Sequence, residues 1–252
     1  MLYAERKNFI LQQLELTPIV KIPELSSFLQ VSIDTIRRDL KNLEKEGLLE
    51  CVRGGARIPD KALQFPDFKG REIIDIHQKM QAAKKAISLI HQHDVIMLNS
   101  GTTNTMLAQE LVRTSLSCTI VTNNIAVVSV MLQNPAFKVI VAGGELDTTE
   151  QSLYGTQCEA ELNKYHPDLC FLSIHAVDPT SGFTDFRFHE IPIMQTMQKT
   201  AKRTLAVMDS GKLNQISKKA VFTHEPLPTI IMDDQITAET KSLYAENGIH
   251  IL

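Results

Sequence analysis

The chain has 252 residues, of which 43% are hydrophobic and 22% are charged, and its net charge is −3. This length and apolar content exclude a disordered or fibrous protein and favour two globular domains. No apolar run is long enough to span a membrane, and the N-terminus is charged where a secretion signal would be apolar, so we expect a cytoplasmic protein.

The cysteines and histidines indicate no metal or cofactor site. Four cysteines lack the paired spacing of a zinc site or a disulfide framework, and the eight histidines are dispersed. Residues 1–58 carry nine Lys or Arg and eight Asp or Glu, a net charge of +1, and the remainder carries 17 and 21, a net charge of −4. This imbalance is too small to show nucleic-acid binding by itself.

The first sixty residues show helical periodicity. The spacing of apolar residues predicts one helix from Ala4 to Glu15 and a second that begins near Pro23. After a short connection at Gln30-Val31, Ser32 is a suitable N-cap for a third helix. Two helices joined by so short a turn are typical of a helix-turn-helix.

The third helix has a basic outer face. Ile36, Leu40 and Leu43 share one side of it, so the opposite side points away from the core. That outer side and its flanks carry mostly charged or polar residues: Asp34, Thr35, Arg37, Arg38, Lys41, Asn42 and Lys45. A helix of this kind enters the DNA major groove in helix-turn-helix proteins. The alternative is a solvated charged helix on a small helical bundle.

A hairpin is predicted directly after this helix. In "GLLECVRGGARI", Leu48 to Val52 and Ala56 to Ile58 read as two strands around a glycine pair. Arg53 and Arg57 flank the turn, so the hairpin can act as a wing that contacts the DNA backbone.

The stretch "VSIDTIRRDLKNLEKEGLLECVRGGARI" resembles the winged helix-turn-helix signature of the DeoR family of bacterial transcriptional regulators, whose pattern is close to "VS..TIRRDL..LE..G.L.R.HGGA". The wing departs from that pattern at Cys51 and Arg53, where arginine and histidine are usual. The resemblance and the basic face together nominate these DNA-contacting residues: Ser32, Thr35, Arg37, Arg38, Lys41, Arg53 and Arg57.

Residues 59–74 contain prolines and charged residues without a clear period, as is typical of a linker. This linker separates a predicted DNA-binding domain, residues 1–58, from a larger domain, residues 75–252. Strand-like and helical segments alternate in the larger domain, which predicts an α/β fold with a mostly parallel sheet covered by helices on both faces. Expected strands are "DVIMLN", "CTIVTN", "FKVIVAGG", "DLCFLSI", "TLAVMD", "AVFT" and "PTIIMD", and expected helices lie at 77–90, 103–111, 157–164, 188–201 and 238–246.

Polar clusters follow several of these strands. "NSGTTN", Asn99 to Asn104, lies between a strand and a helix, where a glycine, two threonine hydroxyls and the helix N-terminus can cradle a phosphate. Thr122 to Asn124, Gly143-Gly144 and Asp209 to Lys212 follow other strands and add donors and a cation at the same sheet edge. An ordinary capping turn is the alternative for any single cluster.

The DeoR resemblance extends through this domain, which is similar to the family's sensor domain, related to ribose-5-phosphate isomerase. It implies binding of a phosphorylated sugar, with the phosphate on Ser100, Gly101, Thr102 and Thr103. Matching positions around the sugar are Lys79, Thr122, Asn123, Gly144, Glu190 and Lys212. Departures at Asn99, His175, Met194 and Gly211 alter charge or volume in the expected pocket, and they predict either a different effector from that of common family members or reduced affinity for theirs. For His175, a buried and hydrogen-bonded side chain is an equal alternative.

These observations favour a sequence-specific regulator, and most simply a repressor of a carbohydrate operon, that binds double-stranded operator DNA as a homo-oligomer and is not an enzyme. A phosphosugar isomerase is the first alternative, but "SIHAVDPT" leaves Asp178 as a lone acid where an isomerase has an acidic cluster. The second alternative is a DNA-binding scaffold whose sensor no longer responds to a ligand.

Overall fold

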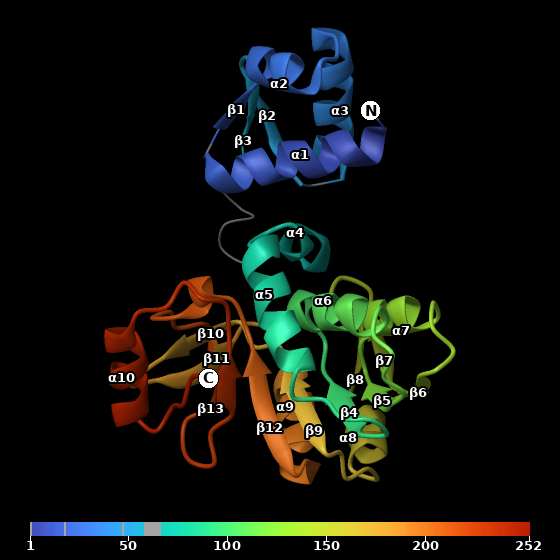
Figure 1. The fold of residues 1–252 in the computed structure, drawn as a ribbon, viewed down its shortest axis with the longest axis vertical. Coiled ribbons are helices and arrows are strands. Elements are labelled where there is room, and N and C mark those ends of the chain that lie inside the picture. Colours follow the sequence, from blue (N-terminus) through green and yellow to red (C-terminus); the bar gives the residue numbers. More distant parts are fainter. Residues whose placement is uncertain (1, 18, 47, 58–66) are drawn as a thin grey trace. The chain divides into compact units, whose positions relative to one another are not determined.

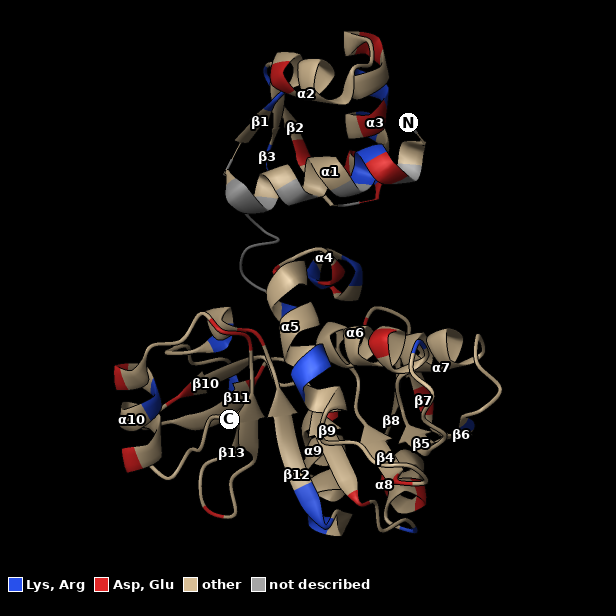
Figure 2. Ribbon diagram, in the orientation of Figure 1, with Lys and Arg blue, Asp and Glu red and all other residues tan. Residues whose placement is uncertain are grey.

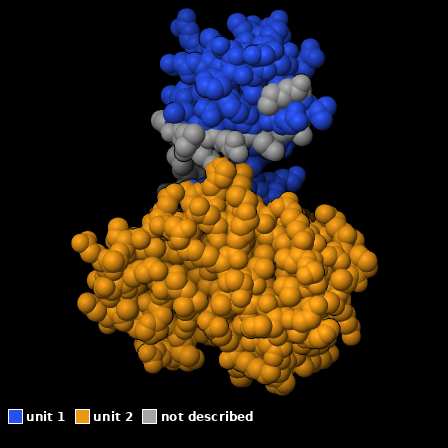
Figure 3. Space-filling view, in the orientation of Figure 1, with its two compact units in different colours: residues 1–75 blue, residues 76–252 orange. Residues whose placement is uncertain are grey.

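A computed structural model describes residues 2–17, 19–46, 48–57 and 67–252 and divides the chain into two compact units, Met1–Asp75 and Ile76–Leu252 (Figures 1 and 3). Ile58, at the end of the predicted wing, and most of the predicted linker lie outside the described residues. Within the described ranges, no helix is both long and apolar enough to cross a membrane.

The first unit combines helices with a small sheet. Its elements are α1 (Tyr3–Leu16), β1 (Ile19–Lys21), α2 (Ile22–Leu29), α3 (Ile33–Lys45), β2 (Glu50–Val52), β3 (Gly55–Arg57) and α4 (Phe68–Glu72). The three strands pair antiparallel in the order β1-β3-β2. The predicted helices and hairpin strands are confirmed within one or two residues. The largest difference is in the first strand of the hairpin, which begins at Glu50 and not at the predicted Leu48.

The strand β1 was not predicted from the sequence. Three residues are too few to show a period, and only Val20 of the strand is buried. The strand also explains the glycine pair of the wing. Gly54 has φ +86° and makes the turn, whereas a side chain on Gly55 would place its Cβ 1.9 Å from the Val20 carbonyl oxygen. Gly55 therefore lets β1 pack against the wing.

Packing on α3 follows the predicted stripe. Ile36, Leu40 and Leu43 are buried in the core of this unit, and the Ser32 hydroxyl caps the helix by accepting a hydrogen bond from Thr35 N at 3.2 Å. Both predictions are confirmed. The capping bond satisfies one of the amides that the first helical turn leaves unpaired.

A buried ion pair joins α1 to α3. Arg6 donates from Nε to Asp39 Oδ2 at 2.6 Å and from Nη2 to Asp39 Oδ1 at 3.0 Å, and only 4% of the Asp39 side chain is exposed. The hydrogen bond to Asp39 raises the pKa of Arg6. Asp39 thus points inward, while Arg37 and Arg38, its neighbours in the sequence, are exposed.

The second unit is built on a six-stranded, all-parallel sheet with the order β14-β12-β9-β4-β5-β6 (Figure 1). Its strands are β4 (Val95–Leu98), β5 (Thr119–Thr122), β6 (Lys138–Val141), β9 (Leu169–Leu172), β12 (Arg203–Val207) and β14 (Thr229–Ile231). The parallel sheet is confirmed. The chain runs outward from β4 to β5 and β6 and then returns to β9 on the other side of β4, so the strand order reverses between β4 and β9.

Helices cover both faces of this sheet. They are α5 (Ile76–Ile87), α6 (Thr102–Leu111), α7 (Ile125–Met131), α8 (Thr156–Leu162) and α9 (Glu190–Thr200). The last helix, α10 (Ala238–Glu246), lies beside the antiparallel strands, where Tyr244 donates to Val177 O (Figure 1). Successive strand residues point to opposite faces: Ile96 and Leu98 pack in the core that includes α5, α6 and α7, and Met97 packs in the core that includes α8 and α9. The α5 helix buries Ala82, Ala83 and Ala86 and leaves Met80 and Ile87 half-buried.

One strand assignment needs correction. "AVFT" forms β13 (Lys219–Phe222), but this strand lies in a separate antiparallel sheet, β10-β11-β13, instead of the parallel one. The partners β10 (Ala176–Asp178) and β11 (Gly182–Asp185), the hairpin β7 (Glu145–Asp147) and β8 (Ser152–Tyr154), the helix α7 and the short 3-10 turn η1 (Ser210–Lys212) were not predicted. Most are only three or four residues long, which is too short for a hydrophobic period.

Replacement of Arg6 by methionine should destabilise the first unit by about 3 kcal/mol, because it leaves the Asp39 carboxylate buried without its partner. Amide hydrogen exchange of peptides from α1 and α3 measures this loss. The control is Lys7→Met, which breaks the more exposed pair with Glu46 and should change exchange far less. Equal exchange in the two variants would mean that the buried Arg6–Asp39 pair stabilises the unit no more than the exposed Lys7–Glu46 pair does.

Candidate DNA-binding surface and effector site

The outer face of α3 carries exposed cations, as do the wing residues (Figure 2). Arg38, Lys41 and Arg53 are exposed and make no ion pair with other described residues. Arg37 donates to Asp34 at 3.1 Å, and Arg57 pairs with Glu50 at 2.9 Å across the hairpin. Lys45, at the end of α3, is likewise exposed and in no ion pair with a described residue, so the unpaired positive charge of this surface lies on Arg38, Lys41, Lys45 and Arg53.

A groove of about 360 Å³ runs between α3 and the wing. Its walls include Arg38, Lys41 and Cys51. Cys51 N donates to Glu44 Oε1 at 2.7 Å, and burial raises the pKa of the Cys51 thiol, with a further contribution from the Glu44 charge. This position, where the DeoR pattern has arginine, thus contributes a neutral side chain to the groove, and the cations on its wall come from the helix.

The phosphate-cradle segment lies at the point where the strand order reverses, as the carboxyl ends of β4 and β9 meet there. Gly101 is the N-cap of α6 with φ +139°, and a Cβ on it would lie 2.3 Å from Ser173 Oγ. Thr102 and Thr103 form the first turn of α6 and are 7% and 4% exposed. The first-turn amides of such a helix have no acceptor within the helix and can bind an anion.

Asn99 bridges β4 and β9 beyond their last paired residues. Its Oδ1 accepts from Ser173 N at 2.7 Å and from Asn104 Nδ2 at 2.8 Å, and its Nδ2 donates to Ser173 O at 3.2 Å. An aspartate here could accept the first two bonds but could not donate the third. The departure at Asn99 therefore has a structural consequence, since its amide extends the pairing of the two strands by one step.

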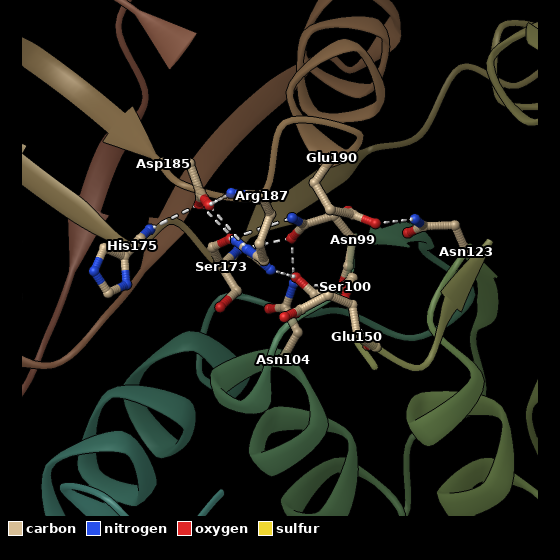
Figure 4. Close-up of polar contacts among 10 residues, drawn as sticks. All are labelled: Asn99, Ser100, Asn104, Asn123, Glu150, Ser173, His175, Asp185, Arg187 and Glu190. Carbon is tan, nitrogen blue, oxygen red and sulfur yellow. Dashed lines mark hydrogen bonds and ion pairs between the residues drawn. The ribbon is translucent and has the colours of Figure 1, made fainter. Parts of the chain in front are cut away.

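Glu190 and Asn123 form a second buried polar group (Figure 4). Glu190 begins α9 and is 2% exposed, and its Oε1 accepts from Asn123 Nδ2 at 3.0 Å. Burial raises the pKa of Glu190 to about 7, although the Arg187 charge and the side chains of Ser152 and Asn123 act to lower it. Glu190 Oε2 and Asn123 Oδ1 accept no hydrogen bond from the described residues, so both can receive ligand hydroxyl groups.

An ion pair that the sequence analysis did not identify connects these groups. Arg187 donates to the Asp185 carboxylate, to Ser100 O at 2.9 Å and to Ser173 O at 2.8 Å (Figure 4). Burial acts against both charges, but the mutual attraction lowers the pKa of Asp185 and raises that of Arg187. The sequence signal was an Asp-x-Arg pair after an apolar strand, which by itself indicates only a loop.

The remaining predicted residues occupy varied positions. His175 donates its backbone N–H to Asp185 Oδ2 at 3.0 Å and stacks edge-on against Phe186. Thr122 Oγ1 donates to Leu98 O at 2.6 Å, and Lys79 is 3% exposed on α5. Gly144 and Lys212 follow β6 and β12, and no hydrogen bond among the described residues joins either to the Arg187 network.

Met194 lies one helical turn beyond Glu190, on the same face of α9. It is fully buried in the apolar core that α9 shares with the sheet. Its effect on the effector pocket stays a prediction. Gly211 lies in the exposed part of the 3-10 turn after β12.

Both units of the chain match models of known protein families. A model of the DeoR C-terminal sensor domain matches residues 74–234, and a model of the DeoR-like helix-turn-helix domain matches residues 6–62. The chain belongs to the DeoR family. It is a transcriptional regulator with a DNA-binding helix-turn-helix, as its resemblance to that family implied.

Individual relatives span almost the whole chain. The HTH-type transcriptional regulator GolR of Listeria innocua is 31% identical over 247 residues, which cover 98% of this chain and 97% of that protein. The glycerol-3-phosphate regulon repressor of Escherichia coli is 27% identical over 92% of this chain and 95% of that protein. Ribose 5-phosphate isomerase A from Methanocaldococcus jannaschii is similar over 54% of this chain and 53% of that chain, with 17% identity and a TM-score of 0.40.

Replacement of Gly101 by alanine should destabilise the sensor domain by about 2–4 kcal/mol, because the new Cβ would overlap Ser173 and the φ of +139° is strained for any side chain. Urea unfolding followed by circular dichroism measures this change. Gly143→Ala is the control, since the nearest atom to its added Cβ is Gln157 Nε2 at 3.9 Å. Equal unfolding midpoints for the two variants would contradict the packing described for Gly101.

Glu190 should make stability depend on pH. Its pKa is about 7 in the folded protein and near 4.5 when unperturbed, so between these values the unfolded chain releases the proton first. The free energy of unfolding therefore falls as pH rises through this window, by roughly 3 kcal/mol in total. Glu190→Gln stays neutral and should lose this dependence, so urea unfolding of wild type and variant should diverge between pH 5 and pH 8. Parallel pH profiles would contradict the raised pKa.

Proposed function

We propose that this DeoR-family protein represses a carbohydrate operon and that a phosphorylated sugar bound at the phosphate-cradle segment, Asn99 to Asn104, modulates its affinity for DNA. The supporting observation is the geometry of this segment at the reversal of strand order, where a helix N-terminus and two threonine side chains lie beside the paired Glu190 and Asn123. The helix end suits a phosphate, and the unpaired acceptor oxygens suit sugar hydroxyl groups.

The DNA contacts we propose follow from the exposed face of α3. Arg38 and Lys41 contact bases or phosphates in the major groove, Ser32 and Thr35 contact the backbone near the helix N-terminus, and Arg53 extends from the wing. Arg37 and Arg57 take part only if they exchange their present carboxylate partners for phosphates.

A regulator fits the site better than an isomerase does. Asp178, the lone acid expected in an isomerase-like role, caps a turn: its Oδ1 accepts from Thr180 N, Thr180 Oγ1 and Ser181 N. The hydrogen bond from the Thr180 hydroxyl is the largest of the effects that lower the pKa of Asp178, so this carboxylate is a poor base. Glu190 is the remaining acid of the site with a raised pKa, and binding of sugar hydroxyls accounts for it without turnover.

We infer that the protein acts as a homo-oligomer in the cytoplasm. Helix-turn-helix modules bind the two halves of a pseudo-palindromic site as dimers, and the chromosomal DNA that they read is in that compartment. Effector binding then has to favour one arrangement of the sensor domains, and a coupling free energy of about 1–3 kcal/mol is enough for regulation.

The test is fluorescence anisotropy of the full-length protein on DNA from upstream of its own gene, at fixed salt, with a panel of phosphorylated and unphosphorylated sugars. Arg38→Ala should weaken operator binding by about 1–3 kcal/mol and leave sugar binding intact. Its control is Arg113→Ala, at an exposed arginine of the sensor domain just after α6. Thr102→Val should retain operator binding and lose the response to the sugar. Its control is Thr156→Val, at the first position of α8 after another positive-φ glycine.

The outcomes separate the alternatives. Release of the operator by one phosphosugar, lost in Thr102→Val, would support both halves of the proposal. Specific binding that no compound changes would favour a scaffold with a silent sensor, and conversion of a phosphosugar by the protein alone would favour an isomerase. Undiminished operator binding by Arg38→Ala would refute the proposed recognition helix.

A further inference from the structure

Arg187 is the most constrained charged residue of the sensor domain. Its side chain is 5% exposed, and its guanidinium donates from Nε and Nη2 to Asp185, from Nη1 to Ser100 O and from Nη2 to Ser173 O. These contacts join three chain segments: the loop after β4, the loop after β9 and the end of β11. The antiparallel sheet is thereby tied to the phosphate-cradle segment of the parallel sheet (Figure 4).

Asp185 is held just as firmly. Its carboxylate is fully buried and accepts the backbone N–H groups of Arg187 at 2.9 Å and of His175 at 3.0 Å, in addition to the guanidinium. Two backbone donors together with a forked cation satisfy a buried carboxylate well. Asp185 therefore fixes where the guanidinium lies, and the guanidinium fixes the Ser100 and Ser173 carbonyl groups.

One N–H group of Arg187 remains available. An arginine has five, and the four bonds listed above use one on Nε, one on Nη1 and two on Nη2. Nη1 lies 3.3 Å from the point where a Cβ of Gly101 would stand, so this nitrogen is close to the N-cap of α6. No described residue accepts its second hydrogen.

The charges around the guanidinium are mixed. Asp185 neutralises it most directly, and Glu150 and Glu190 also lie close enough to raise the pKa of Arg187, so the group stays positive at any working pH. Arg187 and the helix end both attract an anion. Glu190 repels an anion when it is ionised, and it can donate a hydrogen bond to one when it is protonated. An anion on the cradle should therefore also favour the protonated form of Glu190.

We propose that the Asp185–Arg187 pair is the positioning element of the anion cradle and that Arg187 Nη1 donates its fifth N–H to the anion bound on the first turn of α6. The inference rests on the proposed function, and it assigns a role that neither Asp185 nor Arg187 had in the sequence analysis. It also implies selection for phosphate-like oxyanions, whose several oxygens can accept from one arginine N–H and from helix amides together.

The test measures inorganic phosphate binding to the full-length protein by isothermal titration calorimetry, with potassium chloride at matched ionic strength in the reference. Arg187→Lys keeps the charge but cannot reproduce the fork, so phosphate affinity should fall about tenfold or more. The matched control is Arg113→Lys, an exposed arginine paired with Glu110 near the end of α6, which should leave phosphate affinity unchanged. Thermal unfolding of each variant is recorded in parallel.

A second variant addresses folding. Asp185→Asn combined with Arg187→Gln removes both charges, so no buried charge is left unpaired, and the protein should fold and bind phosphate weakly. A lower melting temperature with unchanged phosphate affinity in either folded variant would overturn the proposal and leave only a structural role.

The wild-type and Thr102→Val titrations distinguish this failure from failure of the proposed function. Phosphate binding that depends on Thr102 but not on Arg187 would reject the positioning role and retain the cradle. Wild-type protein that binds no phosphate would reject both.

Discussion

The sensor domain depends on how the polar groups at the diverging ends of β4 and β9 are satisfied. Parallel strands that separate leave backbone donors and acceptors without partners, and burial makes such groups costly. Here the side-chain amide of Asn99 forms hydrogen bonds with the backbone N–H and carbonyl groups of Ser173. The Arg187 guanidinium donates to the carbonyl groups of Ser100 and Ser173. The loop that follows β4 is consequently held in place at the N-terminus of α6.

The same arrangement bears on the proposed effector site. The fixed side chains use most of their own hydrogen-bonding capacity on the protein, and a few buried polar groups are left without a partner among the described residues. Those groups include the first-turn amides of α6 and the acceptor oxygens of Glu190 and Asn123. A rigid surround with a few unused polar groups is the general form of a specific small-molecule site.

The DNA-binding unit is also stabilised by a buried ion pair between two of its elements. The Arg6–Asp39 pair clamps α1 to the inner face of α3, so the outer face of α3 is presented in a defined orientation. Its wing depends on Gly55, whose missing side chain admits β1. In both units a buried charge points inward and has its own partner: Asp39 pairs with Arg6, and Asp185 pairs with Arg187.

Local chemistry in the sequence was enough to predict the three helices of the first unit, the Ser32 cap, the parallel strands and the polar strand ends, because periodicity and capping act over a few residues. The family followed from the dense match around α3. Other features required long-range contacts: β1 exists because it pairs with β3, and β10, β11 and β13 form a sheet of their own. Likewise, Arg187 reaches Ser100 across 87 positions of the chain. Only tertiary structure could decide these, since a three-residue strand or a buried ion pair has no periodic pattern and is stabilised by partners far away in the sequence.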